Sequence, residues 1–154
     1  MEIKNKRVVV TGAASGIGRA LCEEFFASEV QSIVCVDMNI EGAEETAKNV
    51  NGIAIRADVS EEKDIINVIK KANEFYGGID IFCSNAGIGG KPGLLNSEPS
   101  DWDKIWGVNV MSHIHAAKNV LPQMIEQGGG YLMNTSSAAG LLTQLGAAGY
   151  AVTK

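Results

Sequence analysis

A tyrosine and a lysine near the end of the chain stand at a spacing that suits proton transfer. Tyr150 and Lys154 are four positions apart, so a helix would bring both side chains to one face. An ammonium group beside a phenol stabilises the phenolate, and such a tyrosine can take a proton from a reacting oxygen or return it. The pair predicts a general acid and base, although this spacing alone is not specific.

A glycine-rich segment near the start has the spacing of a nucleotide-binding turn. In VVVTGAASGIGRA, an apolar run is followed by Gly12, Gly16 and Gly18 at the opening of a helical segment. Such glycines allow a tight turn and let a pyrophosphate approach the helix N-terminus, whose free N–H groups favour negative charge. The segment is not a P-loop, because Arg19 follows Gly18 where that motif needs lysine. We expect a dinucleotide site, with a purely structural glycine turn as the alternative.

An acidic residue ends the next apolar run at the distance expected for ribose binding. Asp37 lies 19 residues beyond Gly18, close to the offset of about 20 at which a carboxylate binds a ribose 2′-hydroxyl. The carboxylate would repel the 2′-phosphate of NADP, and neither Met38 nor Ser15 supplies a cation for that phosphate. The sequence therefore predicts NAD as the cofactor. A role of Asp37 as a cap of the next helix is also open.

Short runs rich in β-branched residues alternate with segments of helical periodicity. The expected strands lie within residues 7–12, 32–37, 52–58, 80–87 and 130–136. This alternation predicts α/β structure: a Rossmann-type, doubly wound parallel sheet with helices on both faces. Since no linker or internal repeat interrupts the pattern, we expect residues 1–154 to form one dinucleotide-binding domain.

The helical segments give expectations of their own. Residues 99–130 read as one long helix that is stopped by glycines. Ser60 and Ser100 precede acidic residues and are expected to cap two helices. The first helix is expected to bury one apolar face, made of Ile17, Ala20, Leu21 and Phe25.

The composition argues against several classes of partner. With a formal net charge of −5 and no cluster of basic residues, the sequence indicates no positively charged surface that would bind nucleic acid or an anionic membrane. No apolar run approaches the roughly 20 residues of a membrane span. Cys22, Cys35 and Cys83 are widely spaced and are expected to be reduced core thiols of a cytoplasmic protein. His113 and His115 would face different directions on a helix, so they read as structural or surface residues, and we expect no metal site.

Together these motifs make the chain resemble the short-chain dehydrogenase/reductase family along its whole length. The Thr-Gly-x-x-x-Gly-x-Gly pattern of the family runs from Thr11 to Gly18, and its Asn-Ala-Gly motif occupies residues 85–87. A second asparagine often precedes that motif, where this chain has Ser84. The resemblance also matches an acid of the adenine pocket to Asp58. The expected cofactor-binding set is Gly12, Ser15, Gly16, Ile17, Gly18, Asp37, Met38, Asp58, Val59, Asn85, Ala86, Gly87, Tyr150 and Lys154.

The same resemblance implies a catalytic set of Asn109, Ser137, Tyr150 and Lys154. Ser137 is matched rather than Ser136, because it directly precedes Ala-Ala-Gly and lies 13 positions before Tyr150. The implied reaction is hydride transfer between NAD and a secondary alcohol or ketone, with Tyr150 as acid and base. By resemblance, Lys154 also binds the nicotinamide ribose, Ser137 orients the substrate oxygen, and Asn109 supports a water joined to the lysine.

Family members usually continue well beyond the Tyr-x-x-x-Lys motif. The chain is therefore expected to be a fragment that has the first five strands, lacks the C-terminal part of the fold and is inactive alone. The resemblance further implies a homodimer or homotetramer.

Two other functions stay open. An adenosyl-cofactor methyltransferase shares the glycine turn and the acid but gives no reason for the Ser137, Tyr150 and Lys154 set. A nonenzymatic NAD-binding module would bind the cofactor without turnover.

Overall fold

A five-stranded parallel sheet forms the centre of the structure, a computed structural model that describes residues 2–142 and 145–154. The sheet order is β3-β2-β1-β4-β5, so the direction of winding reverses between β1 and β4. Ligands of open α/β sheets bind at such a reversal, beyond the carboxyl ends of the strands. The strands are β1 (Arg7–Thr11), β2 (Ser32–Asp37), β3 (Ile53–Arg56), β4 (Ile81–Ser84) and β5 (Tyr131–Asn134), each within its expected segment.

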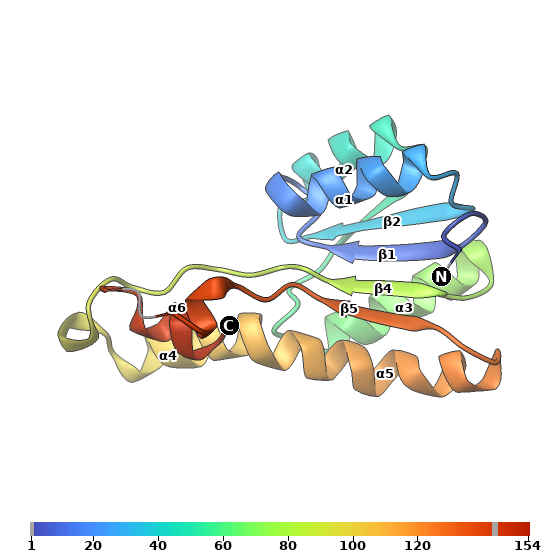
Figure 1. Cartoon of the computed structure of the whole chain (residues 1–154). Coiled ribbons are helices and arrows are strands. Elements are labelled where there is room, and N and C mark those ends of the chain that lie inside the picture. The colour runs from blue at the N-terminus through green and yellow to red at the C-terminus, as the bar shows by residue number, and fades with distance from the viewer. Residues whose placement is uncertain (1, 143–144) are drawn as a thin grey trace.

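Helices cover both faces of this sheet, as Figure 1 shows. One face carries α1 (Gly16–Ala27) and α2 (Ile40–Asn49), and the other carries α3 (Glu62–Tyr76) and α5 (Ser112–Glu126). This arrangement confirms the expected doubly wound α/β fold. None of the helices in the described ranges is long and apolar enough to span a membrane.

Alternating strand residues fill a separate core on each face. On β1, Val8 and Val10 pack in one cluster with Cys22 and Phe25 of α1, whereas Val9 belongs to the cluster on the α3 and α5 side. Burial of apolar surface contributes about 25 cal/mol per Å². Both faces of the sheet are thus held by packing, and the ends of the strands are left for binding.

The expected buried face of α1 is wrong at two of its four residues, Ile17 and Ala20. Ile17 is 65% exposed and Ala20 is exposed as well, while the buried residues of this helix are Gly18, Cys22 and Phe25. A Cβ atom on Gly18 would collide with the carbonyl oxygen of Gly12, so the two backbones are in direct contact. This contact, rather than the largest apolar side chain, decides which face of α1 meets the sheet.

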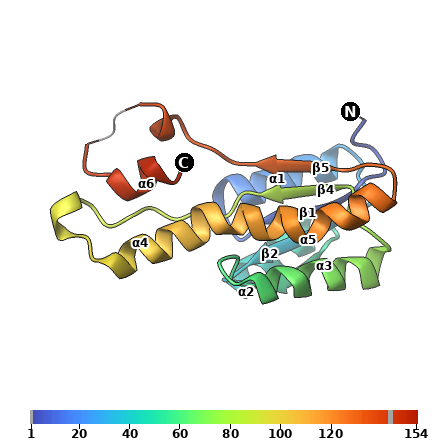
Figure 2. The same ribbon diagram turned by 90° about the horizontal axis from the view of Figure 1, so that it is seen from below.

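The expected long helix is a continuous helical segment with an irregular middle, seen along its length in Figure 2. It consists of α4 (Pro99–Trp106), a π-helical turn (Gly107–Met111) and α5. Single π turns inside α-helices often lie at functional sites. The irregular turn contains Asn109, one of the residues of the expected catalytic set.

The two expected serine caps are wrong. The hydroxyl group of Ser60 donates to Asp58 at 2.6 Å, and α3 begins two residues after Ser60. Ser100 lies inside α4 instead of before it. The N–H group of Glu98, the residue before α4, donates to the carboxylate of Asp101 at 2.9 Å. At the start of α4 a carboxylate thus accepts the contact, whereas Glu61, the residue before α3, makes no side-chain capping hydrogen bond.

Candidate active site

A cleft of about 700 Å³ opens at the carboxyl ends of the strands. Its walls come from the turns that follow β1, β2, β3 and β4, from Thr135 after β5, and from the short helix α6 (Ala148–Val152) with Lys154. Every residue of the expected cofactor-binding set lines this cleft. The structure thus brings together residues from both ends of the chain.

The glycine turn leaves the N-terminus of α1 open toward the cleft. Gly12 and Gly16 have φ angles of +73° and +54°, which residues with a Cβ atom rarely adopt. Ser15 is the residue before the helix, but its side chain makes no capping hydrogen bond, and no acidic residue lies in the first turn. The first N–H groups of α1 are consequently available to an anion such as a pyrophosphate.

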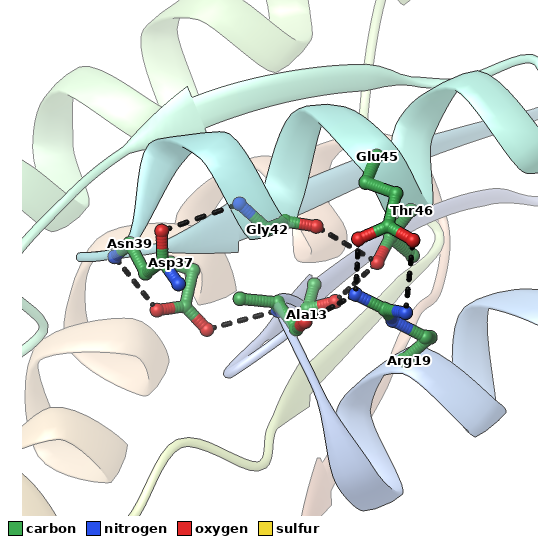
Figure 3. A network of polar contacts seen from close by, with 8 residues as sticks. Ala13, Arg19, Asp37, Asn39, Gly42, Glu45 and Thr46 are labelled. Carbon is green, nitrogen blue, oxygen red and sulfur yellow. Dashed lines mark hydrogen bonds and ion pairs between the residues drawn. The ribbon is translucent and has the colours of Figure 1, made fainter.

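Backbone N–H groups fix the carboxylate of Asp37 at the edge of the cleft. Its Oδ2 accepts a hydrogen bond from the N–H of Ala14 at 3.0 Å, and its Oδ1 accepts one from the N–H of Asn39 at 2.9 Å (Figure 3). Asn39, rather than Asp37, caps α2, through a hydrogen bond from Gly42. The remaining lone pairs of Asp37 can accept from ribose hydroxyl groups.

Asn85 joins the ends of three neighbouring strands. The N–H groups of Asn85 and Ala86 donate to the hydroxyl oxygen of Thr11 at 3.0 and 3.1 Å. The side chain of Asn85 donates to the carbonyl of Thr11 and accepts from the hydroxyl of Thr135, both at 3.0 Å. The sequence reasoning missed Thr135; its signal is a polar residue directly after β5, at the same sheet edge as Asn85.

Tyr150 and Lys154 are neighbours, as their spacing indicates. The Nζ atom of Lys154 lies 5.9 Å from the centroid of the Tyr150 ring and donates a hydrogen bond to the carbonyl of Thr135 at 3.2 Å. A Cβ atom on Gly87 would lie 3.0 Å from this Nζ and 3.3 Å from Oδ1 of Asn109. A phenol and an ammonium therefore share one end of the cleft with Gly87.

Asn109 lies beneath the cleft rather than in its wall. It is 1% exposed, and its Oδ1 accepts from the N–H of Ile88 at 2.9 Å. Its Nδ2 donates to the carbonyl of Ile88 and to the hydroxyl of Thr153, both at 3.0 Å. In this structure the side chain ties the segment after β4 to the end of α6.

Ser137 lies at the start of a short 3-10 helix (Ala138–Gly140) that packs against α6. Its Oγ accepts a hydrogen bond from the N–H of Ala139 at 3.2 Å. It is not among the residues that line the cleft. The structure brings Ser137 close to the tyrosine helix, and its role toward a substrate stays a prediction.

His113 is one helical turn after Asn109 and is partly buried. Within the described part of the chain, its Nδ1 atom is buried and has no hydrogen-bond partner. Burial and the positive charge of Lys154 both lower the pKa of this imidazole. His113 therefore favours the neutral form near the tyrosine and lysine pair.

A parallel sheet with an open helix N-terminus, a fixed carboxylate after β2 and a tyrosine and lysine pair in one cleft defines a Rossmann-type nucleotide-binding protein. Within that class the sequence is more specific. The pattern of the short chain dehydrogenase family matches residues 6–154, and the chain belongs to this family.

Curated relatives agree with this assignment. The chain is 32% identical over 159 residues to the 3-oxoacyl-[acyl-carrier-protein] reductase FabG of Thermotoga maritima, covering 100% of this chain and 64% of that protein. It is 35% identical over 155 residues to the 2-(R)-hydroxypropyl-CoM dehydrogenase of Xanthobacter autotrophicus, covering 95% and 62%. The chain thus spans less than two thirds of the length of these relatives.

Solved structures resemble it over nearly the whole chain. A short chain dehydrogenase/reductase from Burkholderia phymatum, in complex with NAD, matches with a TM-score of 0.94 and 29% identity, over 99% of this chain and 56% of that one. A 3-ketoacyl-(acyl-carrier-protein) reductase from Brucella melitensis, complexed with NADH, matches with a TM-score of 0.92 and 29% identity, over 98% and 65%.

Proposed function

We propose that the protein containing this chain is an NAD-dependent oxidoreductase that acts on a secondary alcohol or ketone. One observation carries the proposal: Tyr150 and Lys154 line the same cleft as the glycine turn and Asp37. Family membership and the reductase and dehydrogenase names of the relatives support it further.

Each part of the cleft would hold one part of the dinucleotide. The open N-terminus of α1 would bind the pyrophosphate, and Asp37 would accept hydrogen bonds from the adenosine ribose. Asp58 and Val59 would border the adenine. At the other end, the segment 85–87 and Lys154 would border the nicotinamide and its ribose. When bound, the nicotinamide supplies the hydride chemistry.

Tyr150 would transfer the proton that accompanies this reaction. A ketone that becomes an alcohol needs a proton at its oxygen, and an alcohol that is oxidised must lose one. The phenol of Tyr150 would do both, and the ammonium of Lys154 would stabilise the phenolate. Ser137 would orient the substrate oxygen, and Asn109 would support the lysine through a water.

NAD is favoured over NADP because Asp37 carries a negative charge held by two backbone N–H groups. A 2′-phosphate at that position would meet this charge, and the neighbouring Met38 and Ser15 offer no cation to offset it.

Residues 1–154 would serve as a cofactor-binding domain in the complete protein. The 154-residue polypeptide by itself is expected to be inactive, because Tyr150 lies in a five-residue helix with no fully buried residue. A homo-oligomer in the complete protein is expected from family membership. Exposed apolar side chains along α4 and α5 support that expectation, namely Trp106, Ile114, Leu121 and Ile125.

The test uses the complete protein, NAD and NADP, and a panel of secondary alcohols and ketones. Formation or loss of the reduced nicotinamide absorbance is expected with NAD. Tight NAD binding without turnover of any compound would favour the nonenzymatic module, and turnover with NADP alone would overturn the cofactor preference.

A further inference from the structure

An ion pair joins α1 to α2 behind the glycine turn. Nη2 of Arg19 lies 3.0 Å from Oε2 of Glu45, and Nη1 of Arg19 donates to Oε1 at 3.4 Å. The same Nη2 also donates to the carbonyl oxygen of Ala14 at 2.7 Å. Neither charged residue lines the cleft, so neither is placed to touch a ligand there.

We propose that Arg19, held by Glu45, is a positioning residue for the cofactor and acts through Ala14. This inference rests on the proposed binding of NAD in the cleft. Figure 3 shows Arg19 on one side of the turn and Asp37 on the other. Ala14 connects them, because its carbonyl accepts from Arg19 and its N–H donates to Asp37 at 3.0 Å.

The preceding residue, Ala13, is held in the same way. Its N–H donates to the carbonyl of Val36 at 3.1 Å, and its carbonyl accepts from the hydroxyl of the buried Thr46 at 2.8 Å. A Cβ atom on Gly42 would lie 2.8 Å from that of Ala14, so α2 approaches the turn closely. All backbone polar groups of Ala13 and Ala14 thus have partners in β2, α1 or α2.

These contacts matter because the segment 13–15 lies between two glycines, whose backbones have the fewest steric restrictions. Gly12 and Gly16, both with positive φ, can rotate more freely than other residues. A turn that has to become ordered during binding lowers the affinity, whereas a turn that is already ordered does not. The contact from Arg19 therefore preorganises the turn and, through Ala14, the orientation of the Asp37 carboxylate.

We expect that the ion pair can be removed without unfolding the protein. The side chains of Arg19 and Glu45 are 30% and 62% exposed, and exposed ion pairs contribute little to stability. An effect on NAD binding can therefore be measured in folded variants.

The experiment compares Arg19→Met, Glu45→Gln and the double variant of the complete protein by NAD titration and steady-state kinetics. Arg19→Met should raise the Kd for NAD about three- to tenfold, the range expected for one lost hydrogen bond. The value of kcat at saturating NAD and the KM for the alcohol should stay the same. Glu45→Gln should also raise the Kd for NAD, but by less. Introduced into the Arg19→Met variant, it should raise the Kd by a smaller factor than it does in the unaltered protein. Arg19→Lys should recover part of the affinity.

Glu29→Gln is the matched control, because it removes an exposed ion pair with Lys4, at 2.7 Å, beyond the carboxyl end of α1. It should leave the Kd for NAD unchanged. An unchanged Kd in folded Arg19→Met, or an equal rise in Glu29→Gln, would refute the positioning role alone. A failure of the unaltered protein to bind NAD would instead overturn the proposed function together with this inference.

Discussion

Replacing Asp37 by asparagine removes the charge that is proposed to reject NADP while keeping the shape of the side chain. Two backbone N–H groups hold the carboxylate at the edge of the cleft. Asparagine keeps one oxygen acceptor, so the turn should retain part of this support. The expected result is a shift of preference from NAD toward NADP.

The size of the shift follows from the position of Asp37. Two unit charges about 4 Å apart interact with about 1 kcal/mol in water and about 4 kcal/mol at an effective dielectric constant of 20. Asp37 is partly exposed and its neighbour Met38 is 52% exposed, so solvent screening favours the lower part of this range, about 1–2 kcal/mol. NAD also loses a charge-assisted hydrogen bond, which contributes about 1.5–3 kcal/mol. Since 1.4 kcal/mol is tenfold, the ratio of affinities should move by about 10- to 100-fold after partial compensation by the amide.

The assay measures kcat/KM and Kd for both cofactors in the complete protein. Asp58→Asn is the matched control, because Asp58 is assigned to the adenine side, which NAD and NADP share. The control should weaken both cofactors equally. If Asp37→Asn changes the ratio by less than twofold, or if the unaltered protein already prefers NADP, the electrostatic reasoning is wrong.

Three further substitutions test the roles of Lys154, His113 and Asp80. Lys154→Ala should raise the Kd for NAD and lower kcat, because the ammonium is assigned to bind the ribose and to stabilise the phenolate. A change in only the Kd or only kcat would show that Lys154 has just one of these two roles. Because the pKa of His113 is lowered in the folded protein, His113 binds a proton at a higher pH in the unfolded chain than in the folded one. The free energy of unfolding should therefore decline from about pH 6.5 downward. His113→Leu should flatten that decline in urea unfolding, and an unchanged slope would contradict it. The side chain of Arg7 donates a hydrogen bond of 2.8 Å to the carboxylate of Asp80 and lowers its pKa. This interaction stabilises the folded protein above about pH 4, and the stabilisation is lost as the pH falls further. Asp80→Asn should cost about 1–3 kcal/mol at pH 7 and much less near pH 2, and an equal loss at both would argue against the ion pair.

Much of the cleft could be predicted from the sequence because its chemistry depends on local rules. Gly12 and Gly16 follow a strand and have the positive φ angles that the turn needs. Asp37 ends β2, and parallel strands bring their carboxyl ends to one edge. Tyr150 and Lys154 are close, as a spacing of four predicts, although α6 ends at Val152 and Lys154 lies just beyond the helix.

Contacts between distant elements were beyond such rules. Ile17 is exposed because the backbone of Gly18 packs against that of Gly12, and the spacing of apolar residues in the sequence does not reveal this contact. The hydrogen bonds of Arg19 with Glu45 and of Ala13 with Thr46 depend on how α2 packs beside α1 and the glycine turn, which the sequence pattern does not specify. Ser137 was matched by motif position, yet its hydroxyl oxygen accepts from Ala139 and the residue does not line the cleft.

In the proposed mechanism Tyr150 transfers the proton within an NAD-binding cleft, and Tyr150→Phe in the complete protein removes the group that would do so. This change removes only the hydroxyl group and leaves the ring beside Lys154. The Kd for NAD, measured by titration, should stay within about threefold, while kcat should fall by about 10²–10⁴, the contribution typical of a general acid or base. A variant that binds NAD normally and keeps more than a tenth of the activity would contradict the claim and assign the proton transfer to another group.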